Sequence, residues 1–300
     1  MIAQIERVEA SRVTARIGRR VERSTPEAAG RRRHERPCSE RKSSDACRSE
    51  ASEAEARIAT RVGDWLSAFA LVYEAYTHKG LAEPNPRGMR VTPYQLLPTT
   101  EILVAVDHHR VVCTASVVRD GLLGLPLEDV YTEEVADRRR QGLVLAEVSC
   151  LADSQEGERT AFSNVLRLMS LCVQCAKARG VDQLLVAVHP HHARFYQGFF
   201  GFEVLGEQRS YGAVLDAPAV ALVLDLNHLA ENHPRGYERL FGKPFPADVL
   251  ACRPMPDHVR QEFALNMPDM AASNECISQH EGHEEDGAAA CESLCRGGIV

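Results

Sequence analysis

Residues 186–214 read VAVHPHHARFYQGFFGFEVLGEQRSYGAV, and this stretch decides the fold. An apolar run, a turn with Pro190 and a short aromatic segment that ends at Gly201 predict a buried strand, a short helix and a further strand. Residues 145–153, LAEVSCLAD, are a second apolar run. A long amphipathic segment that ends at Gly180 separates the two runs, which predicts a strand–helix–strand unit.

The rest of the folded region extends this unit in both directions. Residues 56–80 have apolar side chains at helical spacing, and residues 101–120 read as two strands joined by a tight polar turn at 107–109. A loop and a short helix are expected at 121–142, and two further strands at 202–229. The order of helices and strands predicts an α/β fold with a mixed central sheet and helices on both faces.

Composition divides the chain into four parts. Residues 1–56 are rich in Arg, Glu and Ser and have little to bury, so we expect a disordered tail. Residues 57–229 form the predicted domain, and residues 230–267 form a Pro-rich extension with only short helices. Residues 268–300 are small and polar, which again predicts disorder.

The composition of the whole chain argues against several classes of protein. The chain has 300 residues, 44% of them hydrophobic, and a net charge of −7, so it lacks the basic character of a general nucleic-acid binder. No apolar run is long enough for a transmembrane helix, and the N-terminus lacks the apolar core of a secretory signal. We therefore expect a cytoplasmic protein whose ten cysteines form no disulfide framework.

Several Cys and His residues raise the question of a metal site. Cys172 and Cys175 lie inside the amphipathic segment without a second pair at zinc-finger spacing, which favours core packing. His189, His191 and His192 are too close in sequence to converge on one ion. We predict no metal centre. In the C-terminal tail we expect at most adventitious metal binding, by His280, His283, Cys291 and Cys295.

Three stretches carry a resemblance to known acyltransferases. Residues 186–211, with a Phe-Tyr pair and then a Gly-Phe pair, resemble the last strand–helix unit of the GNAT acyltransferases. Residues 145–153 resemble the Glu-x-Ser-Arg strand of the acyl-homoserine lactone synthases and the related long-chain N-acyl amino acid synthases. With the stretch at 73–120, the chain is most similar to the N-acyl amino acid synthase family, over about residues 58–228.

The resemblance implies a GNAT-like fold, the acyl-CoA N-acyltransferase fold, in which two central parallel strands splay apart. Here they would be residues 145–153 and 184–190, and the acyl thioester arm would enter between them. The implied enzyme is an N-acyltransferase that moves a long-chain acyl group from an acyl carrier protein to the amine of an amino acid. The acyl-phosphopantetheine thioester is then a co-substrate, and no cofactor is bound permanently. Two alternatives remain, a GNAT N-acetyltransferase that uses acetyl- or acyl-CoA and an inactive GNAT-like binding module.

Acyl transfer from a thioester sets the chemistry that the site must supply. A neutral amine attacks the thioester carbonyl and gives an oxyanion. Backbone N–H groups near residues 147–149 would stabilise this oxyanion. Its collapse then releases a thiolate. The resemblance places the catalytic residues at Glu147, Ser149 and Tyr196. Glu147 would be an anchor or base for the amine, and Tyr196 the acid for the thiolate. Alternatively, the Glu147 carboxylate is paired with a buried Arg or with backbone donors. The alternative for Tyr196 is a packed aromatic ring with a bonded hydroxyl.

Substrate-binding residues are expected on the same strands and on neighbouring helices. They are Tyr76, Cys150, Leu151, His189, His192 and Phe195. Cys150 departs from the motif of the resembling families, which has an Arg there, so the group that this Arg binds must be held differently. His192 is either a proton relay or a residue that caps or packs against the helix.

The turn before the long helix bears on the acyl donor. CoA-dependent GNAT enzymes have a Gly-rich turn there, whose N–H groups cradle the pyrophosphate. This chain has one glycine and three acids, Asp153, Glu156 and Glu158, which would repel a pyrophosphate. That favours an acyl carrier protein, which is acidic and needs a basic docking patch. The candidates, each alternatively an ordinary solvated residue, are Arg138, Arg139, Arg140, Arg159, Arg167, Lys177 and Arg179.

Overall fold

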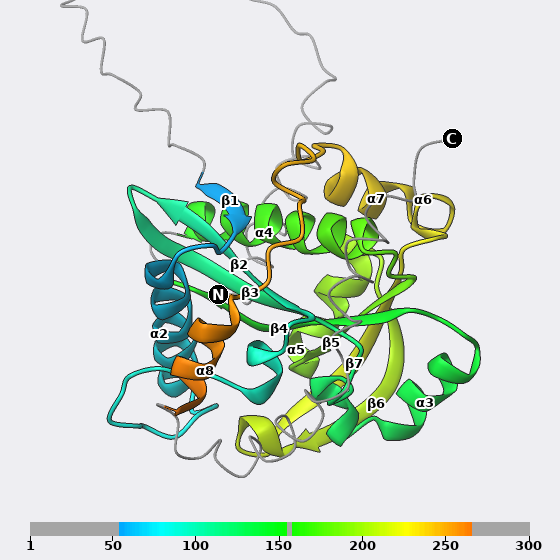
Figure 1. Cartoon of the computed structure of the whole chain (residues 1–300). Coiled ribbons are helices and arrows are strands. Elements are labelled where there is room, and N and C mark those ends of the chain that lie inside the picture. Colours follow the sequence, from blue (N-terminus) through cyan, green and yellow to red (C-terminus); the bar gives the residue numbers. More distant parts are fainter. Residues whose placement is uncertain (1–53, 155–157, 266–300) are drawn as a thin grey trace, which may run out of the picture.

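The computed structural model describes residues 54–154 and 158–265 (Figure 1). The expected C-terminal tail, with its His and Cys residues, lies outside these ranges, as do residues 1–53 of the expected N-terminal tail. The described strands form one seven-stranded sheet with the order β1-β2-β3-β4-β5-β7-β6. They are β1 (Glu55–Ile58), β2 (Thr100–Asp107), β3 (Arg110–Arg119), β4 (Leu145–Asp153), β5 (Gln183–Val188), β6 (Glu203–Tyr211) and β7 (Ala217–Asp225).

The sheet is mixed, as the sequence predicts. β4 and β5 are parallel, and every other neighbouring pair of described strands is antiparallel. The β2–β3 hairpin turns at His108 and His109, whose positive φ angles of 44° and 67° fit a two-residue turn that follows the twist of the strands. A long helix joins β4 to β5, because parallel neighbours need a crossover connection.

Helices cover both faces of the sheet (Figure 1). They are α2 (Val62–His78), α3 (Thr132–Arg140), α4 (Glu158–Ala178), α5 (Pro190–Phe195), α6 (Leu229–Asn232), α7 (Pro234–Phe241) and α8 (Asp257–Leu265). α4, α5 and α7 share one core cluster with the sheet. α2 and α8 lie side by side on the other face, where the rings of Phe69 and Phe263 meet edge to face at 5.1 Å.

β4 and β5 separate soon after they start. Their pairing covers residues 145–147 of β4 and 183–185 of β5. β4 continues to Asp153 and β5 to Val188, so the later parts of these strands are not paired with each other in the described structure. This confirms the splayed parallel strands that the GNAT resemblance implies, and it leaves the β4 edge open towards β5.

A β-bulge redirects the side chains of β4 in this separated part. The register between β3 and β4 shifts between Thr114 and Ser116, so Cys150 and Leu151 share one position opposite β3. Cys150 has a φ of 52°, which non-glycine residues seldom adopt. Cys150 packs beneath α2, whereas Leu151 packs against the core on the α4 side. Bulges of this kind are common beside active sites, where they re-aim a side chain.

The buried side of α2 differs from the prediction. The apolar residues at helical spacing include Val62, Leu66 and Phe69; Phe69 is buried, but Val62 and Leu66 are 48% and 41% exposed. Trp65 and Val72, which lie outside that set, are buried. Burial of an indole ring removes more apolar surface from water than burial of the smaller Val62 or Leu66 side chain, so the helix is rotated to bury Trp65.

The sequence also missed the first strand. β1 begins at Glu55, two residues before the expected start of the domain at 57. Four residues are too few to show a reliable alternation of apolar and polar side chains. Backbone pairing with β2 places β1 at the edge of the sheet, which is a tertiary effect.

Gly201 ends the helical segment after β5, as expected. The π-helical turn η3 (Tyr196–Phe200) precedes it, and Gly201 has a left-handed φ of 91°. A Cβ atom there would lie 2.7 Å from the ring of His233, so no larger residue fits without movement. This tight turn leads the chain into β6 and fixes the position of Tyr196.

Candidate active site

Glu147 occupies the last paired position of β4, where the two parallel strands separate. Its side chain is buried, and Oε2 accepts a hydrogen bond from the backbone N–H of Leu127 at 2.8 Å. Burial raises the pKa of Glu147 to about 8; the hydrogen bond opposes this rise and the charge of Asp129 adds to it. No ion pair joins Glu147 to an arginine within the described residues. The carboxyl group therefore exchanges its proton near neutral pH, as a base for an amine requires.

Three tyrosines lie within electrostatic range of this carboxyl group. They are Tyr76 on α2, Tyr94 on the 3-10 turn η1 (Pro93–Leu96) and Tyr211 at the end of β6. Burial raises the pKa of each, that of Tyr94 to about 12, and the charge of Glu147 raises each further. The Tyr211 hydroxyl also donates to the carbonyl of Pro126 at 2.8 Å, which ties β6 to the loop beside Glu147. The sequence indicated Tyr76; Tyr94 and Tyr211 were missed, although Tyr211 lies in the stretch that decides the fold.

Ser149 and Cys150 follow Glu147 along the separated part of β4. Cys150 and Tyr76 pack against the same small apolar cluster beneath α2. Burial raises the pKa of the Cys150 thiol, and the charge of Arg90 and a hydrogen bond with Ser149 offset this rise only in part. A protonated thiol is a poor nucleophile, which argues against Cys150 as the attacking group.

Arg90 is a site residue that the sequence did not indicate. It lies in the loop between α2 and η1, and its guanidinium carbon is 5.3 Å from the centre of the Tyr76 ring. Its Nη2 donates to the carbonyl of Ala213 at 2.7 Å, in the turn between β6 and β7. No sequence signal could have found this residue, because an arginine in a Pro-rich loop is ordinarily solvated.

Tyr196 lies on the α4 side of the sheet, at the start of η3. Its ring packs against those of Phe195, Phe200 and Phe202, with centroid distances of 6.1, 5.6 and 5.4 Å. Burial raises the pKa of Tyr196, so the phenol keeps its proton at neutral pH. Tyr196 also contributes to the raised pKa of Tyr76, after burial and the Cys150 thiol, so the two phenols interact although they come from different sides of the sheet.

The two predicted histidines behave differently in α5. His189 caps this helix, because its Nδ1 accepts the backbone N–H of His191 at 3.2 Å. His192 does not cap it, and its Nδ1 is buried without a hydrogen-bond partner. Burial lowers the pKa of His192 to about 4, and the charges of His191, His189 and Lys79 lower it further. The imidazole is therefore neutral at neutral pH; the structure excludes the capping role and leaves the proton relay and simple packing as alternatives.

The remaining predicted residues, Leu151 and Phe195, form an apolar wall. Leu151 packs against the core on the α4 side, and Phe195 stacks on Phe199 with centroids 4.9 Å apart. The structure thus divides the predicted residues between the two faces of the sheet. Glu147, Cys150 and Tyr76 belong to the α2 side, and Leu151, Phe195 and Tyr196 belong to the α4 side.

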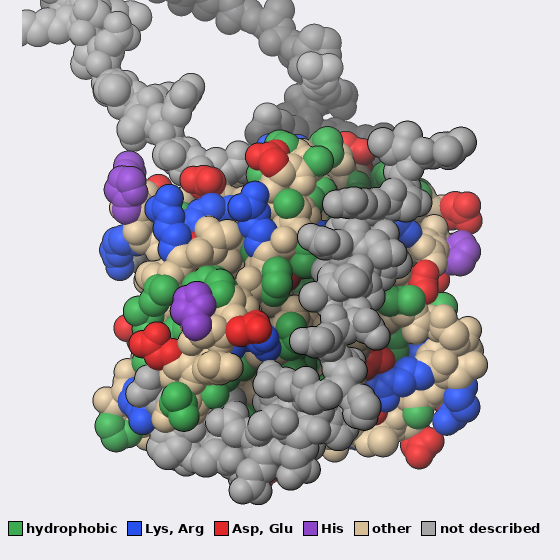
Figure 2. All heavy atoms as spheres, viewed as in Figure 1, with side chains coloured by type: hydrophobic (Ala, Val, Ile, Leu, Met, Phe, Trp, Pro, Cys, Tyr) green, Lys and Arg blue, Asp and Glu red, His purple; other side chains and the backbone are tan. Residues whose placement is uncertain are grey.

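The arginines predicted as a docking patch do not form one surface. Arg179 is buried and pairs with Glu101 at 2.7 Å, and Arg167 lies over the ring of Phe245 at 3.6 Å. Arg139 lies on α3, and the carboxylates of Asp120 and Glu128 hold its guanidinium group. On the face that carries α2 and α8, basic and acidic side chains lie close to one another (Figure 2). The side chain of Arg159 lies outside the described part of the chain.

The acids predicted to repel a pyrophosphate are only partly described. Asp153 is buried at the end of β4, opposite Cys113, rather than exposed in the turn, because it belongs to the predicted strand itself. Glu156 and the side chain of Glu158 lie outside the described residues. Asp153 is therefore not positioned to repel the pyrophosphate of CoA. Of the three predicted acids, only Glu156 and Glu158 remain candidates for this repulsion.

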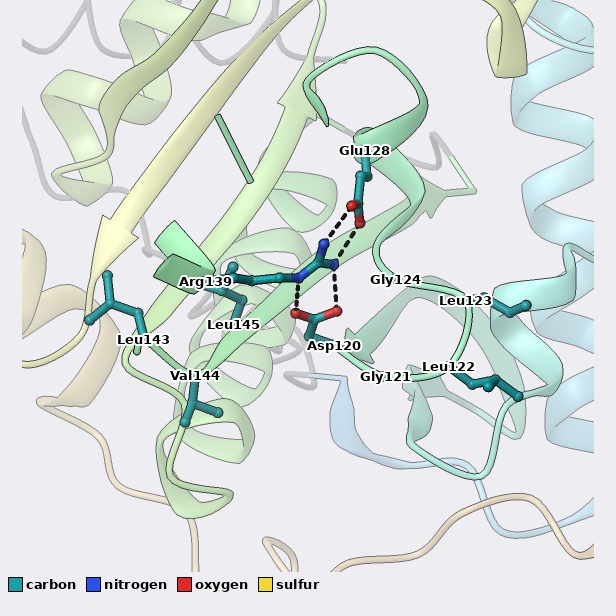
Figure 3. A pocket seen from close by; sticks show the side chains of 10 residues that line it. All are labelled: Asp120, Gly121, Leu122, Leu123, Gly124, Glu128, Arg139, Leu143, Val144 and Leu145. Carbon is teal, nitrogen blue, oxygen red and sulfur yellow. Dashed lines mark hydrogen bonds and ion pairs between the residues drawn. The ribbon is translucent and has the colours of Figure 1, made fainter. Parts of the chain in front are cut away.

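A cavity of about 570 Å³ lies at the other end of β4, near Leu145 (Figure 3). Its wall contains Arg139, which binds Asp120 and Glu128 with both sides of its guanidinium group. Exposed Leu122 and Val144 lie at its rim. None of the predicted site residues lines this cavity, and its only cation is matched by two carboxylates, so we do not assign it to the reaction.

Across residues 54–154 and 158–265, no group of three or more His, Cys, Asp or Glu side chains is arranged to hold a metal ion. None of the helices in these ranges has the length and apolar character needed to cross a membrane.

Comparison with known families assigns the chain. The profile of the family described as N-acyl amino acid synthase FeeM matches residues 67–225, more than half of the chain. The chain belongs to this family. It is therefore an N-acyl amino acid synthase, which is a kind of N-acyltransferase. The matched range contains every predicted site residue, and also Arg90, Tyr94 and Tyr211.

Solved structures show the same fold. FeeM, an N-acyl amino acid synthase from uncultured soil microbes, is 26% identical, with a TM-score of 0.53 over 59% of this chain and 98% of its own. The CoA-dependent acyl-homoserine lactone synthase BjaI is 18% identical, with a TM-score of 0.46 over 69% of this chain and 98% of its own. An acyl-CoA N-acyltransferase from Pseudomonas aeruginosa is 15% identical, with a TM-score of 0.40 over 57% of this chain and 98% of its own. No curated protein matches the chain. The likeness to FeeM confirms the predicted GNAT-like α/β fold.

Proposed function

We propose that this synthase transfers a long-chain acyl group from the phosphopantetheine arm of an acyl carrier protein to the amine of an amino acid. The observation that carries this proposal is the buried carboxyl group of Glu147, which has no cationic partner among the described residues and lies where β4 and β5 separate. A thioester inserted between these strands would bring its carbonyl carbon beside this group. Glu147 would then bind the amine, and the open edge of β4 would bind the thioester.

Each step of the transfer has a group in the site to support it. Glu147 accepts a proton from the amine, and the nitrogen forms a bond to the thioester carbonyl carbon. Backbone N–H groups on the open edge of β4, near Ser149, stabilise the oxyanion. The carbonyl then re-forms, the C–S bond breaks, and the thiolate takes the phenolic proton of Tyr196. His192 lies one helical turn before Tyr196, and its neutral imidazole is suited to return a proton to the phenolate.

The role of Tyr196 has a direct test. The change Tyr196→Phe removes only the hydroxyl group and keeps the packed ring, so the thermal unfolding temperature should hardly change. We expect kcat to fall by about 10²-fold, the low end for loss of a general acid. The KM for the amino acid should stay within about twofold of wild type, since the proposed role is confined to the leaving group. An unchanged kcat would assign Tyr196 to packing alone.

The surface near His192 supports an acidic partner. Lys79, His189 and His191 are exposed, and all three act on the imidazole of His192. They follow α2 and β5, at the end of β5 where the strands have separated. A carrier protein is acidic, so complementary charge at this end of the sheet would raise its association rate. These residues take the place of the arginines that the sequence suggested for docking.

Mass spectrometry of the lipids of cells that overexpress the full chain tests the whole proposal. A new N-acylated amino acid should accumulate, and it should be absent from cells that express Glu147→Gln. With purified protein, long-chain acyl carrier protein should support turnover and acetyl-CoA should not. Turnover with acetyl-CoA and none with acyl carrier protein would contradict the proposed donor. No N-acyl product from any thioester would contradict the proposed function.

A further inference from the structure

The positively charged side chain of Arg90 connects α2 to the turn that follows β6. Its backbone N–H donates to the carbonyl of Phe69 at 3.1 Å, which anchors the loop on α2. The guanidinium group lies over the ring of Tyr76, and Nη2 donates to Ala213 at 2.7 Å. These contacts hold the guanidinium group in one place beside the separated part of β4.

The guanidinium group of Arg90 is incompletely satisfied. Its Nε is buried and has no hydrogen-bond partner, and no ion pair joins Arg90 to a carboxylate anywhere in residues 54–154 and 158–265. Arg179 and Arg260 also have a buried Nε without a hydrogen-bond partner, but each of them pairs with a carboxylate through another nitrogen, which Arg90 does not. A buried N–H without a partner is costly, and its persistence points to a ligand that supplies the missing acceptor.

Arg90 and Glu147 act on the same small region. Burial is the main cause that raises the pKa of Tyr76, and the Cys150 thiol raises it further. The charge of Arg90 lowers the pKa of this phenol, and the charge of Glu147 raises it. Arg90 also offsets the raised pKa of the Cys150 thiol, which results from burial. One cation and one carboxyl group thus act electrostatically on the same phenol and the same thiol, and the cation also lies over the ring of that phenol. An amino acid carries the two complementary groups, a carboxylate and an amine, on the same carbon atom.

We propose that Arg90 binds the α-carboxylate of the acceptor amino acid and thereby makes the site selective for amino acids over simple amines. This inference rests on the proposed function and names the residue that selects its acceptor. The amine of the same molecule is directed to Glu147. The small thiol of Cys150 leaves room for this arrangement at the position where the motif of the resembling families has an Arg. The cation comes instead from a loop about 60 residues earlier in the chain.

The test compares an amino acid with its α-carboxamide, which keeps the amine and the side chain but loses the negative charge. For the wild type we expect kcat/KM to be about 10- to 100-fold higher for the amino acid, the size expected of a charged hydrogen-bonded contact. The change Arg90→Gln should remove this preference through a higher KM for the amino acid. The KM for the acyl donor should not change.

Matched variants separate binding from packing. Arg87→Gln removes a guanidinium group from an exposed position of the same loop and should leave the preference intact. Arg90→Lys keeps the charge but not the forked geometry, so it should restore part of the preference. If Arg90→Gln lowers the unfolding temperature and keeps the preference for the carboxylate, the residue is structural and the inference is wrong.

A binding measurement distinguishes failure of this inference from failure of the proposed function. Calorimetric titration of the full chain with the amino acid and with its carboxamide needs no acyl donor. Tighter binding of the amino acid by the wild type but not by Arg90→Gln supports the role of Arg90 even if the donor has been assigned wrongly. Equal binding of acid and amide by the wild type would overturn the role of Arg90 and leave acyl transfer itself untouched.

Discussion

Two buried carboxyl groups in the same sheet have opposite surroundings. Glu101 on β2 and Glu147 on β4 are each 2% exposed. Glu101 pairs with Arg179, the residue directly after α4, at 2.7 Å and accepts the backbone N–H of Arg253 at 3.1 Å. Glu147, in the described structure, has one hydrogen bond from a neutral backbone donor.

The difference separates a structural group from a chemical one. A carboxylate that is matched by an arginine stays ionised and holds elements together; here it links β2, α4 and the segment before α8. A carboxyl group that is buried without a cation resists ionisation, and burial raises the pKa of Glu147 to about 8. Such groups concentrate at sites of proton transfer. Burial alone does not distinguish Glu147 from Glu101; the proposed catalytic role of Glu147 rests on burial without a matching charge.

The largest expected effect is on activity, at Glu147. The change Glu147→Gln keeps the shape of the protonated side chain and removes its ability to take a proton from the amine. We expect kcat/KM for acyl transfer to fall by about 10²–10⁴-fold, the usual contribution of a general base. Product formation by mass spectrometry and the unfolding temperature should be measured together. A Glu147→Gln variant with wild-type turnover would contradict the proposed role of Glu147 as the base.

The next effect is on stability, at Glu101. The change Glu101→Gln leaves the guanidinium group of Arg179 buried without a countercharge, which costs about 3–5 kcal/mol of unfolding free energy. Denaturant unfolding measures this loss. Whatever fraction stays folded should retain its kcat, because Glu101 is not part of the proposed reaction. A stable Glu101→Gln protein that has lost its kcat would assign Glu101 to the chemistry and undo the distinction.

The smallest effect concerns pH. Because burial raises the pKa of Glu147 to about 8, the carboxyl group is mostly protonated at pH 7 and the base form grows as pH rises. The rate should therefore be about tenfold lower at pH 7 than on a plateau above pH 9. In Glu147→Gln any residual rate should lack this step. A profile of the wild type that is flat between pH 6 and pH 9 would show that Glu147 does not act as the base.

Much of the fold was predictable because its signals are local. The apolar runs at 145–153 and 183–188, the amphipathic segment between them and the glycines that end the helices all act within a few residues of one another. The edge strand β1 was not predictable, since four residues carry no clear pattern and pairing with β2 defines them. The buried side of α2 was misjudged because its contacts with the sheet and with α8 decide its rotation.

The candidate site was predictable where the resemblance supplied it and not elsewhere. Glu101 and Glu147 both stand in apolar strands, and only the resemblance, not the local pattern, tells them apart. The partner of Glu101 lies 78 positions away, at Arg179. Arg90 was invisible for the same reason, since its contact with Ala213 spans 123 positions.

The sequence by itself determined the strand–helix–strand unit, the place of Glu147 within it and the stop at Gly201, because periodicity and turn chemistry act between near neighbours. Only the tertiary structure decided which carboxyl group lacks a cation, where the parallel strands separate and which arginine faces the site. Those properties depend on charges and backbone edges that distant parts of the chain bring together, and no local pattern records them.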